Sequence, residues 1–254
     1  MNLILTGTGT SQGAPVLTCS CEVCLSTDPR DSRLRTSALL QAGKKNIVID
    51  AGPDLRQQML KHKVKHVDAV LLTHQHHDHV GGMDDLRPYI FRKKKPMDVY
   101  AGHETIAAIQ KMYYYAFEID LYPGAPTFNM IPVEGSPFFI NDTEVQPVAG
   151  MHGKMPVWGY RFGKKLAYIT DIKTMEENEL NKLKGLDILV LSAVFPGKHH
   201  SHMSLEEALD FIKKVRPGKA YLTHISHKMG RYNDISRSLP ENVFVAYDNM
   251  EISL

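Results

Sequence analysis

The segment THQHHDH, at residues 73–79, concentrates side chains that bind metal ions. It follows the apolar run VDAVLLT, and a tight loop after a strand can aim alternate side chains to one side. His74 and His76 can then hold one divalent ion, while Asp78 and His79 hold a second beside it. Imidazole and carboxylate ligands together suit zinc, manganese or iron. An exposed, solvated histidine-rich loop is the alternative, so the interpretation depends on further ligands elsewhere.

Two later residues of metal-binding type also follow short apolar runs. YIT runs into Asp171 and YLT runs into His224, as VLLT runs into His74. In an α/β sheet the ends of separate strands meet at one edge, where binding sites commonly lie. We therefore expect these three side chains to converge on one edge of a sheet.

All the cysteines of the chain lie in one segment, TCSCEVCL at residues 18–25. Cys19, Cys21 and Cys24 cannot all pair in disulfides, and they are spaced as closely as metal ligands. No signal peptide is visible before them, so we expect a reducing, cytoplasmic location, where clustered thiols indicate a metal before a disulfide. A tetrahedral zinc site needs a fourth ligand. The alternative is three incidental small residues in a loop.

The composition is that of an ordinary globular chain. Hydrophobic residues make up 43% of the 254 residues, charged residues make up 23%, and the formal net charge is +2. A charge this small gives no argument for binding nucleic acid or a membrane surface, and no apolar stretch of about 18 residues exists to span a membrane. No linker or composition shift marks a boundary, so residues 1–254 are expected to form a single domain.

Short apolar runs alternate with helix-like segments along the chain. Strands are expected at residues 2–6, 67–73, 157–162, 165–170, 186–193, 219–223 and 242–247, with a hairpin formed by 36–43 and 46–52 around a turn at 43–46. Helices are expected at residues 54–63, 103–117, 175–184 and 204–215. Ser204 and Glu207 form a capping box at the start of the last of these. This mixture of strands and helices predicts an α/β layered architecture.

The pattern His74-x-His76-x-Asp78-His79 resembles the metal-binding signature of the metallo-β-lactamase superfamily of hydrolases. Three later residues match the remaining ligands of that family in the same order, namely His152 in GMHGK, Asp171 in YITD and His224 in LTHISH. The resemblance extends from LTGTGTSQGAPV near the start to YDNMEI near the end. It implies an αββα four-layer sandwich with a binuclear metal site along one edge of the two central sheets.

The resemblance also implies a role for each ligand. The two metals would be held by His74, His76 and His152 and by Asp78, His79 and His224, respectively, with Asp171 bridging them. Asp50, in VIDAG, matches an aspartate that supports the histidine loop from behind the ligands. Without the resemblance, Asp50 is equally well explained as a strand-end residue that caps the next turn.

Two divalent ions roughly 3.5–4 Å apart can share a water molecule and lower its pKa to about neutral. The expected reaction is attack of this metal-bridging hydroxide, oriented by Asp78, on a small (cyclic) phosphodiester. His202, in KHHSHMSLEE, resembles the catalytic histidine of phosphodiesterases in this superfamily, and we expect it to be the general acid. The alternative, a solvent-exposed loop, is favoured for its neighbours His199 and His200.

The cysteine segment narrows the family further. With His224 in the active site, His227 is free to point elsewhere and complete a Cys3His zinc site. Such a cluster resembles the PhnP-type phosphoribosyl cyclic phosphodiesterases of the carbon–phosphorus lyase pathway, where these residues bind a structural zinc. The segments LTHISH and DNMEI are similar to that family as well. The resemblance also implies a homodimer.

Two other functions share parts of this pattern. A tRNA 3′-processing endonuclease has the same ligand pattern, but no inserted basic arm for tRNA is visible here, so nucleic acid is not the expected substrate. Some pyrroloquinoline-quinone biosynthesis proteins of type B resemble this chain in their cysteine cluster, but their active-site ligands are degenerate. If this chain were like them, it would be a non-catalytic binding or transport protein. Basic runs at residues 61–66 and 92–96 suit a phosphorylated substrate, although such runs are more often solvated faces.

Overall fold

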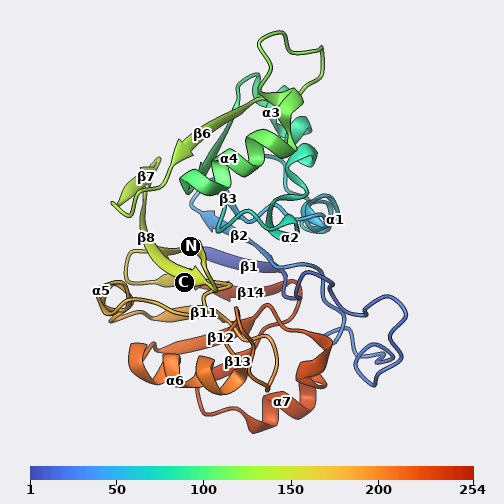
Figure 1. The fold of residues 1–254 in the computed structure, drawn as a ribbon, viewed down its shortest axis with the longest axis vertical. Coiled ribbons are helices and arrows are strands. Elements are labelled where there is room, and N and C mark those ends of the chain that lie inside the picture. The colour runs from blue at the N-terminus through green and yellow to red at the C-terminus, as the bar shows by residue number, and fades with distance from the viewer.

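The computed structural model describes residues 1–254 as two β-sheets packed face to face, with helices on both outer faces (Figure 1). Each sheet has seven strands. This arrangement is the αββα sandwich that the family resemblance implies, so the predicted fold class is confirmed. The first and last strands pair with each other, which places the two ends of the chain side by side. No helix is long and apolar enough to cross a membrane.

The first sheet has the strand order β14-β1-β2-β3-β4-β5-β6. Its strands from β14 to β3 pair antiparallel, and those from β3 to β6 pair parallel. The bounds are Asn2–Gly7 for β1, Ser37–Ala42 for β2, Lys45–Ile49 for β3, Ala69–Leu71 for β4, Met97–Ala101 for β5, Phe128–Pro132 for β6 and Met250–Ser253 for β14.

The second sheet has the order β13-β12-β11-β10-β9-β8-β7 and the same division into an antiparallel and a parallel half. The bounds are Phe138–Ile140 for β7, Thr143–His152 for β8, Met155–Phe162 for β9, Leu166–Ile169 for β10, Ile188–Ser192 for β11, Lys219–Thr223 for β12 and Val243–Val245 for β13. The parallel halves of both sheets end at the edge where the candidate ligands gather.

Helices cover the outer face of each sheet. The first sheet carries α1 (Leu55–Lys61), α2 (His77–Val80), α3 (Arg87–Lys93) and α4 (His103–Met112), and the second carries α5 (Glu177–Asn181), α6 (Leu205–Val215) and α7 (Tyr232–Ser238). Short 3-10 turns occupy Met83–Leu86, Tyr114–Ala116 and His227–Met229. The predicted capping box is confirmed, because the Ser204 hydroxyl accepts the N–H of Glu207 and the Glu207 carboxylate accepts the N–H of Ser204.

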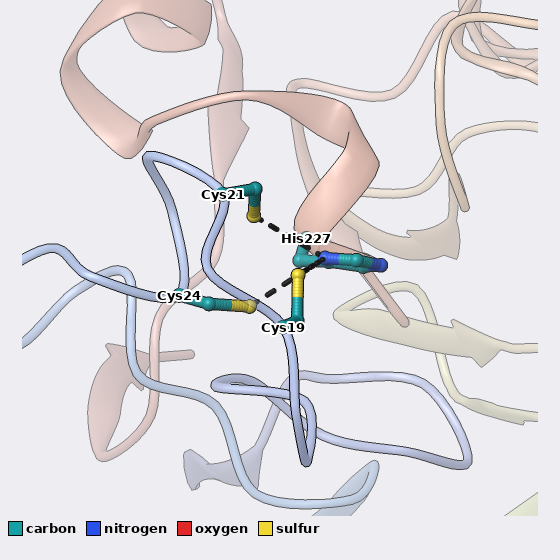
Figure 2. A group of neighbouring side chains, drawn as sticks. All are labelled: Cys19, Cys21, Cys24 and His227. Carbon is teal, nitrogen blue, oxygen red and sulfur yellow. Dashed lines mark hydrogen bonds between the residues drawn. The ribbon is translucent and has the colours of Figure 1, made fainter.

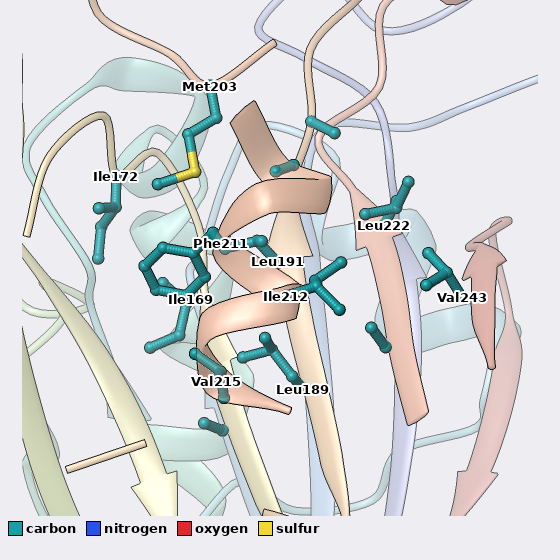
Figure 3. Close-up of a cluster of buried hydrophobic side chains, with 14 of the residues drawn as sticks. Ile169, Ile172, Leu189, Leu191, Met203, Phe211, Ile212, Val215, Leu222 and Val243 are labelled. Carbon is teal, nitrogen blue, oxygen red and sulfur yellow. The ribbon is translucent and has the colours of Figure 1, made fainter. Parts of the chain in front are cut away.

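Side chains that alternate along the strands build three buried clusters. In β11, Ile188 and Val190 lie in the cluster between the sheets, while Leu189 and Leu191 lie in the cluster under α6. Figure 3 shows the latter cluster, in which Phe211 of α6 packs over the strands. Burying each such side chain contributes about 1.5–3 kcal/mol, so period-two strands hold the four layers together.

Most of the expected elements are present, with shifted ends. The hairpin of β2 and β3 is confirmed, but its loop contains only Gly43 and Lys44, because Ala42 pairs with Lys45. The helix expected at 103–117 ends at Met112, and a 3-10 turn follows.

Two hydrogen bonds join the second sheet to the start of the histidine segment. The hydroxyl of Tyr160, a fully buried residue of β9, donates to the carbonyl oxygen of Leu72 at 2.6 Å. The N–H of Trp158 donates to the carbonyl oxygen of Thr73 at 2.9 Å. Both acceptors come immediately before His74, so this contact fixes where the segment leaves the first sheet.

We predict that Tyr160→Phe lowers the free energy of unfolding by about 1–2 kcal/mol, because it removes a buried hydrogen bond while preserving the ring. Urea denaturation measures this difference. Tyr114→Phe is the matched control, since Tyr114 is 64% exposed, and it should change stability by less than about 0.5 kcal/mol. Equal effects of the two substitutions would show that the contact between the sheets contributes nothing.

Candidate metal centre

The candidate ligands lie at the ends of strands on one edge of the sandwich. His74 follows β4, His152 is the last residue of β8, Asp171 follows β10 and His224 follows β12. Thus the structure brings together residues that are up to 150 positions apart, counting from His74 to His224. The convergence expected from the sequence depends on the parallel pairing of β3 with β4, of β10 with β11 and of β11 with β12.

Three residues at this edge have left-handed backbone conformations. The φ angles of Asp50, Asp171 and His224 are 63°, 59° and 55°. Such angles cost non-glycine residues roughly 1–3 kcal/mol each and persist only where surrounding bonds impose them. Here the N–H of Asp171 donates to the Ser192 hydroxyl at 3.0 Å. Sharp turns of this kind redirect each side chain from the strand toward the common edge.

The histidine segment is partly helical, which differs from the loop expected from the sequence. Residues His77–Val80 form the single turn α2, with His76 at its N-cap in an extended conformation. The N–H of His79 donates to the carbonyl oxygen of His76 at 2.9 Å. This turn places Asp78 and His79 at the centre of the site and leaves His77 exposed.

Asp50 organises the histidine segment from below. Its buried carboxylate accepts the N–H of Thr73 at 2.8 Å, the hydroxyl of Thr73 at 2.9 Å and Nδ1–H of His79 at 2.7 Å. Because the Thr73 hydroxyl donates its hydrogen to Asp50, its oxygen can only accept from His74. Nδ1–H of His74 therefore donates to this oxygen at 2.9 Å. Both histidines therefore direct Nε2 to the centre, which is the usual arrangement of metal-binding histidines.

A similar bond orients His152. Its Nδ1–H donates to the backbone carbonyl oxygen of Asp171 at 2.9 Å, which leaves its Nε2 as the free ring nitrogen. Sequence reasoning assigned no role to Thr73, although a hydroxyl directly before the first ligand at a strand end was an available signal.

The centre contains closely spaced donor atoms without hydrogen-bond partners. Nε2 of His79 lies 3.3 Å from Oδ2 of Asp78 and 3.4 Å from Oδ2 of Asp171. Nε2 of His224 lies 3.3 Å from Oδ1 of Asp171 and 3.7 Å from Oδ2 of Asp78. Nε2 of His79 and both ring nitrogens of His224 are buried and unpartnered. Buried polar atoms are rarely left unpaired, so this donor set fits metal ions.

The remaining predicted ligand, His76, is exposed but lies against the same centre. Its Nδ1 is 3.0 Å from Nε2 of His74, and its ring centroid is 5.1 Å from that of His152. Two nitrogens that each lie about 2.0–2.1 Å from one zinc ion are themselves separated by about 3 Å. The rings of His74, His76 and His152, the three nitrogen ligands expected for one ion, therefore lie next to one another.

The charges of the centre are strongly interdependent. Burial alone raises the pKa of Asp171, but the charges of His224 and His79 outweigh it and hold this pKa well below its usual range. For His74, burial disfavours the charged form and lowers the pKa, and the neighbouring charge of His79 lowers this pKa further. The carboxylates thus stay ionised and His74 stays neutral, as metal binding requires.

His202 lies inside the centre and not at its rim. Its Nδ1 is 3.3 Å from Oδ1 of Asp171, and its side chain is 16% exposed. Burial lowers the pKa of His202 to about 3, although Asp171 opposes this effect. Of the two neighbours expected to be solvent-exposed, His200 is exposed, whereas Nδ1 of His199 accepts the backbone N–H groups of Ser201 and His202 at 3.3 Å.

The cysteine segment forms a second cluster with His227 (Figure 2). The Sγ atoms of Cys19, Cys21 and Cys24 lie 3.3, 3.4 and 3.5 Å from Nδ1 of His227. A hydrogen bond from the backbone N–H of Cys24, followed by one from His227, lowers the pKa of Cys21 to about 6. Three thiols and one imidazole nitrogen make the donor set of a structural Cys3His zinc site.

Comparisons with known sequences agree with this architecture. Residues 45–225 match the family model described as a beta-lactamase superfamily domain. The chain is 38% identical over 255 residues to the octanoyltransferase of Porphyromonas gingivalis, a match that covers 99% of this chain and 51% of that protein. It is also 25% identical over 231 residues to the coenzyme PQQ synthesis protein B of Methylobacterium nodulans, covering 75% of this chain and 72% of that protein.

Comparisons with solved structures give the same fold. A crystal structure of a new diphosphatase from the PhnP family has a TM-score of 0.93 at 33% identity, covering 100% of this chain and 97% of that chain. Zinc-bound PqqB from Methylobacterium extorquens has a TM-score of 0.80 at 19% identity, covering 100% of both chains. Human tRNase Z, short form, has a TM-score of 0.71 at 19% identity, covering 100% of this chain and 99% of that chain.

The fold and the family match define the class of protein: the chain belongs to the metallo-β-lactamase superfamily. Within that superfamily, the chain is similar over its full length to the PhnP-family diphosphatase, and it spans about half the length of the octanoyltransferase.

Gly52 provides a test of how α2 is positioned. A Cβ atom at Gly52 would lie 2.0 Å from the carbonyl oxygen of Asp78, so Gly52→Ala must displace the turn that carries Asp78 and His79. We predict that this variant binds less metal and loses roughly 2 kcal/mol or more of stability. Metal analysis after dialysis and thermal unfolding measure both effects. Gly43→Asn, where the new side chain meets open space, is the control; wild-type metal content in Gly52→Ala would contradict the prediction.

Proposed function

We propose that the chain is a binuclear metal-dependent phosphodiesterase that hydrolyses a small, disubstituted phosphate, either a cyclic phosphodiester or a diphosphate ester. The observation that carries this proposal is the position of His202. A histidine that lies 3.3 Å from Asp171, but outside the seven proposed ligands, can contact a phosphate bound at the same centre.

The proposed ligands follow the family pattern. One ion would be held by His74, His76 and His152, and the other by Asp78, His79 and His224. Asp171, whose carboxylate oxygens lie 3.4 and 3.3 Å from Nε2 of His79 and of His224, would be a ligand shared by the two ions. The donor set suits zinc, manganese or iron. Two such ions supply an activated water near neutral pH and neutralise the charge that develops on the phosphate in the transition state.

The protein's own groups then have separate tasks. Asp78, which is 12% exposed, presents a carboxylate that can orient the attacking water by accepting its hydrogen bond. His202 binds the anionic phosphate and donates a proton to the leaving oxygen. Burial favours the neutral form of His202, so the negative charge of the bound substrate has to favour its protonation.

The comparisons support this function over two alternatives. The PhnP-family relative is a diphosphatase with 33% identity, so phosphate chemistry occurs in a near relative. Human tRNase Z shares only the fold at 19% identity. A non-catalytic role like that suggested for PQQ synthesis proteins is disfavoured by the complete set of seven donors in this chain. Because the chain spans 51% of the octanoyltransferase, that similarity does not assign the transferase activity to the matched half.

We predict that the metal-loaded protein hydrolyses members of a panel of cyclic nucleotides, cyclic ribose phosphates, diphosphate esters and bis(p-nitrophenyl) phosphate. His202→Ala should lower kcat by about 10²–10⁴-fold while both active-site ions are retained. His200→Ala, an exposed neighbour, is the control and should keep wild-type kcat. Loss of metal together with activity would make His202 a ligand, and absence of turnover on the whole panel would refute the proposed function.

We also predict about three metal ions per chain, one of them a structural zinc bound by the cysteines and His227. His227→Ala should lose one zinc and lower the melting temperature by at least about 4 °C, the shift that about 2 kcal/mol gives in a chain of this size. The exposed Lys228→Ala should retain zinc content and stability. Unchanged zinc stoichiometry in His227→Ala would show that the fourth ligand is wrongly assigned.

A further inference from the structure

A cavity of about 390 Å³ lies between α1 and α3, and none of its lining residues belongs to the metal centre or the cysteine cluster. Some of its lining residues are apolar, and we call them the floor of the cavity: Leu55, Met59, Leu60, Val64 and Tyr89. Leu60 is 61% exposed, so apolar surface at this site remains accessible to a ligand. Cavities of about 300–1,000 Å³ are typical of small-molecule sites.

The charged lining residues, which we call the rim of the cavity, are mostly basic. Arg56, Lys63, Lys65 and Arg92 line it, and Asp85 is its only acidic residue. None of the four basic side chains forms an ion pair, whereas nearby Lys45 and Lys93 both pair with Asp68. The whole chain has a net charge of only +2, so this rim is a local concentration of uncompensated positive charge. Partial burial raises the pKa of Asp85, and the positive charge of Arg56 opposes this effect.

We propose that this cavity binds a small amphiphilic anion, with an alkyl chain on the apolar floor and a carboxylate, phosphate or similar head group between the basic side chains. A hydrated inorganic anion would use the rim but leave the floor exposed. An uncharged apolar molecule would leave four cations without a partner. An amphiphilic anion satisfies both parts of the site, because burial of the chain and pairing of the head group contribute together.

The inference can be tested with alkyl sulfonates, whose head group is a weak metal ligand and therefore avoids the metal centre. Hexanesulfonate, added below its micelle-forming concentration to the metal-loaded protein, should bind saturably and shift the backbone amide NMR signals of α1 and α3. Each buried methylene strengthens binding up to about fourfold. Hexanesulfonate should therefore bind at least tenfold more tightly than ethanesulfonate.

Variants separate the cavity from diffuse surface charge. Lys65→Glu combined with Arg92→Glu should weaken hexanesulfonate binding at least tenfold, and Leu60→Ser should weaken hexanesulfonate but not ethanesulfonate. The control pair, Lys95→Glu and Lys111→Glu, makes the same charge change at exposed residues outside the cavity and should leave binding within about twofold.

Three outcomes would overturn the inference. An equal loss of hexanesulfonate affinity in the control pair would indicate non-specific attraction. Equal affinity for the two sulfonates would show that the floor does not contact the alkyl chain. Binding only to anionic vesicles would indicate a membrane-facing surface. Hydrolysis by the metal centre should persist in the Lys65→Glu/Arg92→Glu variant. The proposed anion site and the proposed hydrolase activity can therefore be refuted independently of each other.

Discussion

The buried carboxylate of Asp50 is the group on which the arrangement of the metal centre most depends. It follows β3 directly, is fully buried, and bonds to Thr73 after β4 and to His79 in α2. Burial raises the pKa of Asp50, and the charge of His79 opposes this effect. A buried carboxylate is stable only when such partners satisfy it, so the same three bonds that stabilise Asp50 also set the orientation of His79 and the tautomer of His74.

The sandwich makes this arrangement possible because it places the parallel halves of two sheets at a common edge. One sheet supplies Asp50 and the histidine segment, and the other supplies His152, Asp171 and His224. Neither sheet carries a complete set of ligands. The bonds from Tyr160 and Trp158 to the residues before His74 therefore matter to the site as well as to the core, because they keep the two halves in register.

The sequence predicted the members of the site better than the local structure that positions them. The histidine segment, the cysteine spacing and the capping box at Ser204 are local patterns, so they could be recognised directly, whereas the order of the distant ligands came from the family resemblance. The turn α2 and the left-handed Asp50, Asp171 and His224 depend on bonds between distant segments, which no periodicity reveals. Strand β5, Met97–Ala101, was missed because it follows a run of lysines and Asp98 interrupts its apolar residues. Three basic residues from the runs assigned to solvated faces, Lys63, Lys65 and Arg92, are exposed as expected, and they also line a cavity that has apolar residues.

The two clusters of metal-binding type are connected through one short segment. His224 lies in the metal centre, His227 lies among the cysteines, and between them the N–H of Ile225 donates to the carbonyl oxygen of Thr8 at 2.8 Å. The carboxylate of Asp248 in turn accepts the N–H and hydroxyl of Thr8 at 2.8 and 2.7 Å. His224 has no hydrogen bond of its own to orient its ring, unlike His79 and His152. Instead, its ring stacks against the rings of His79 and His202, with centroids 5.6 and 5.1 Å away, while the bonds of Ile225 and Thr8 hold the backbone that carries it.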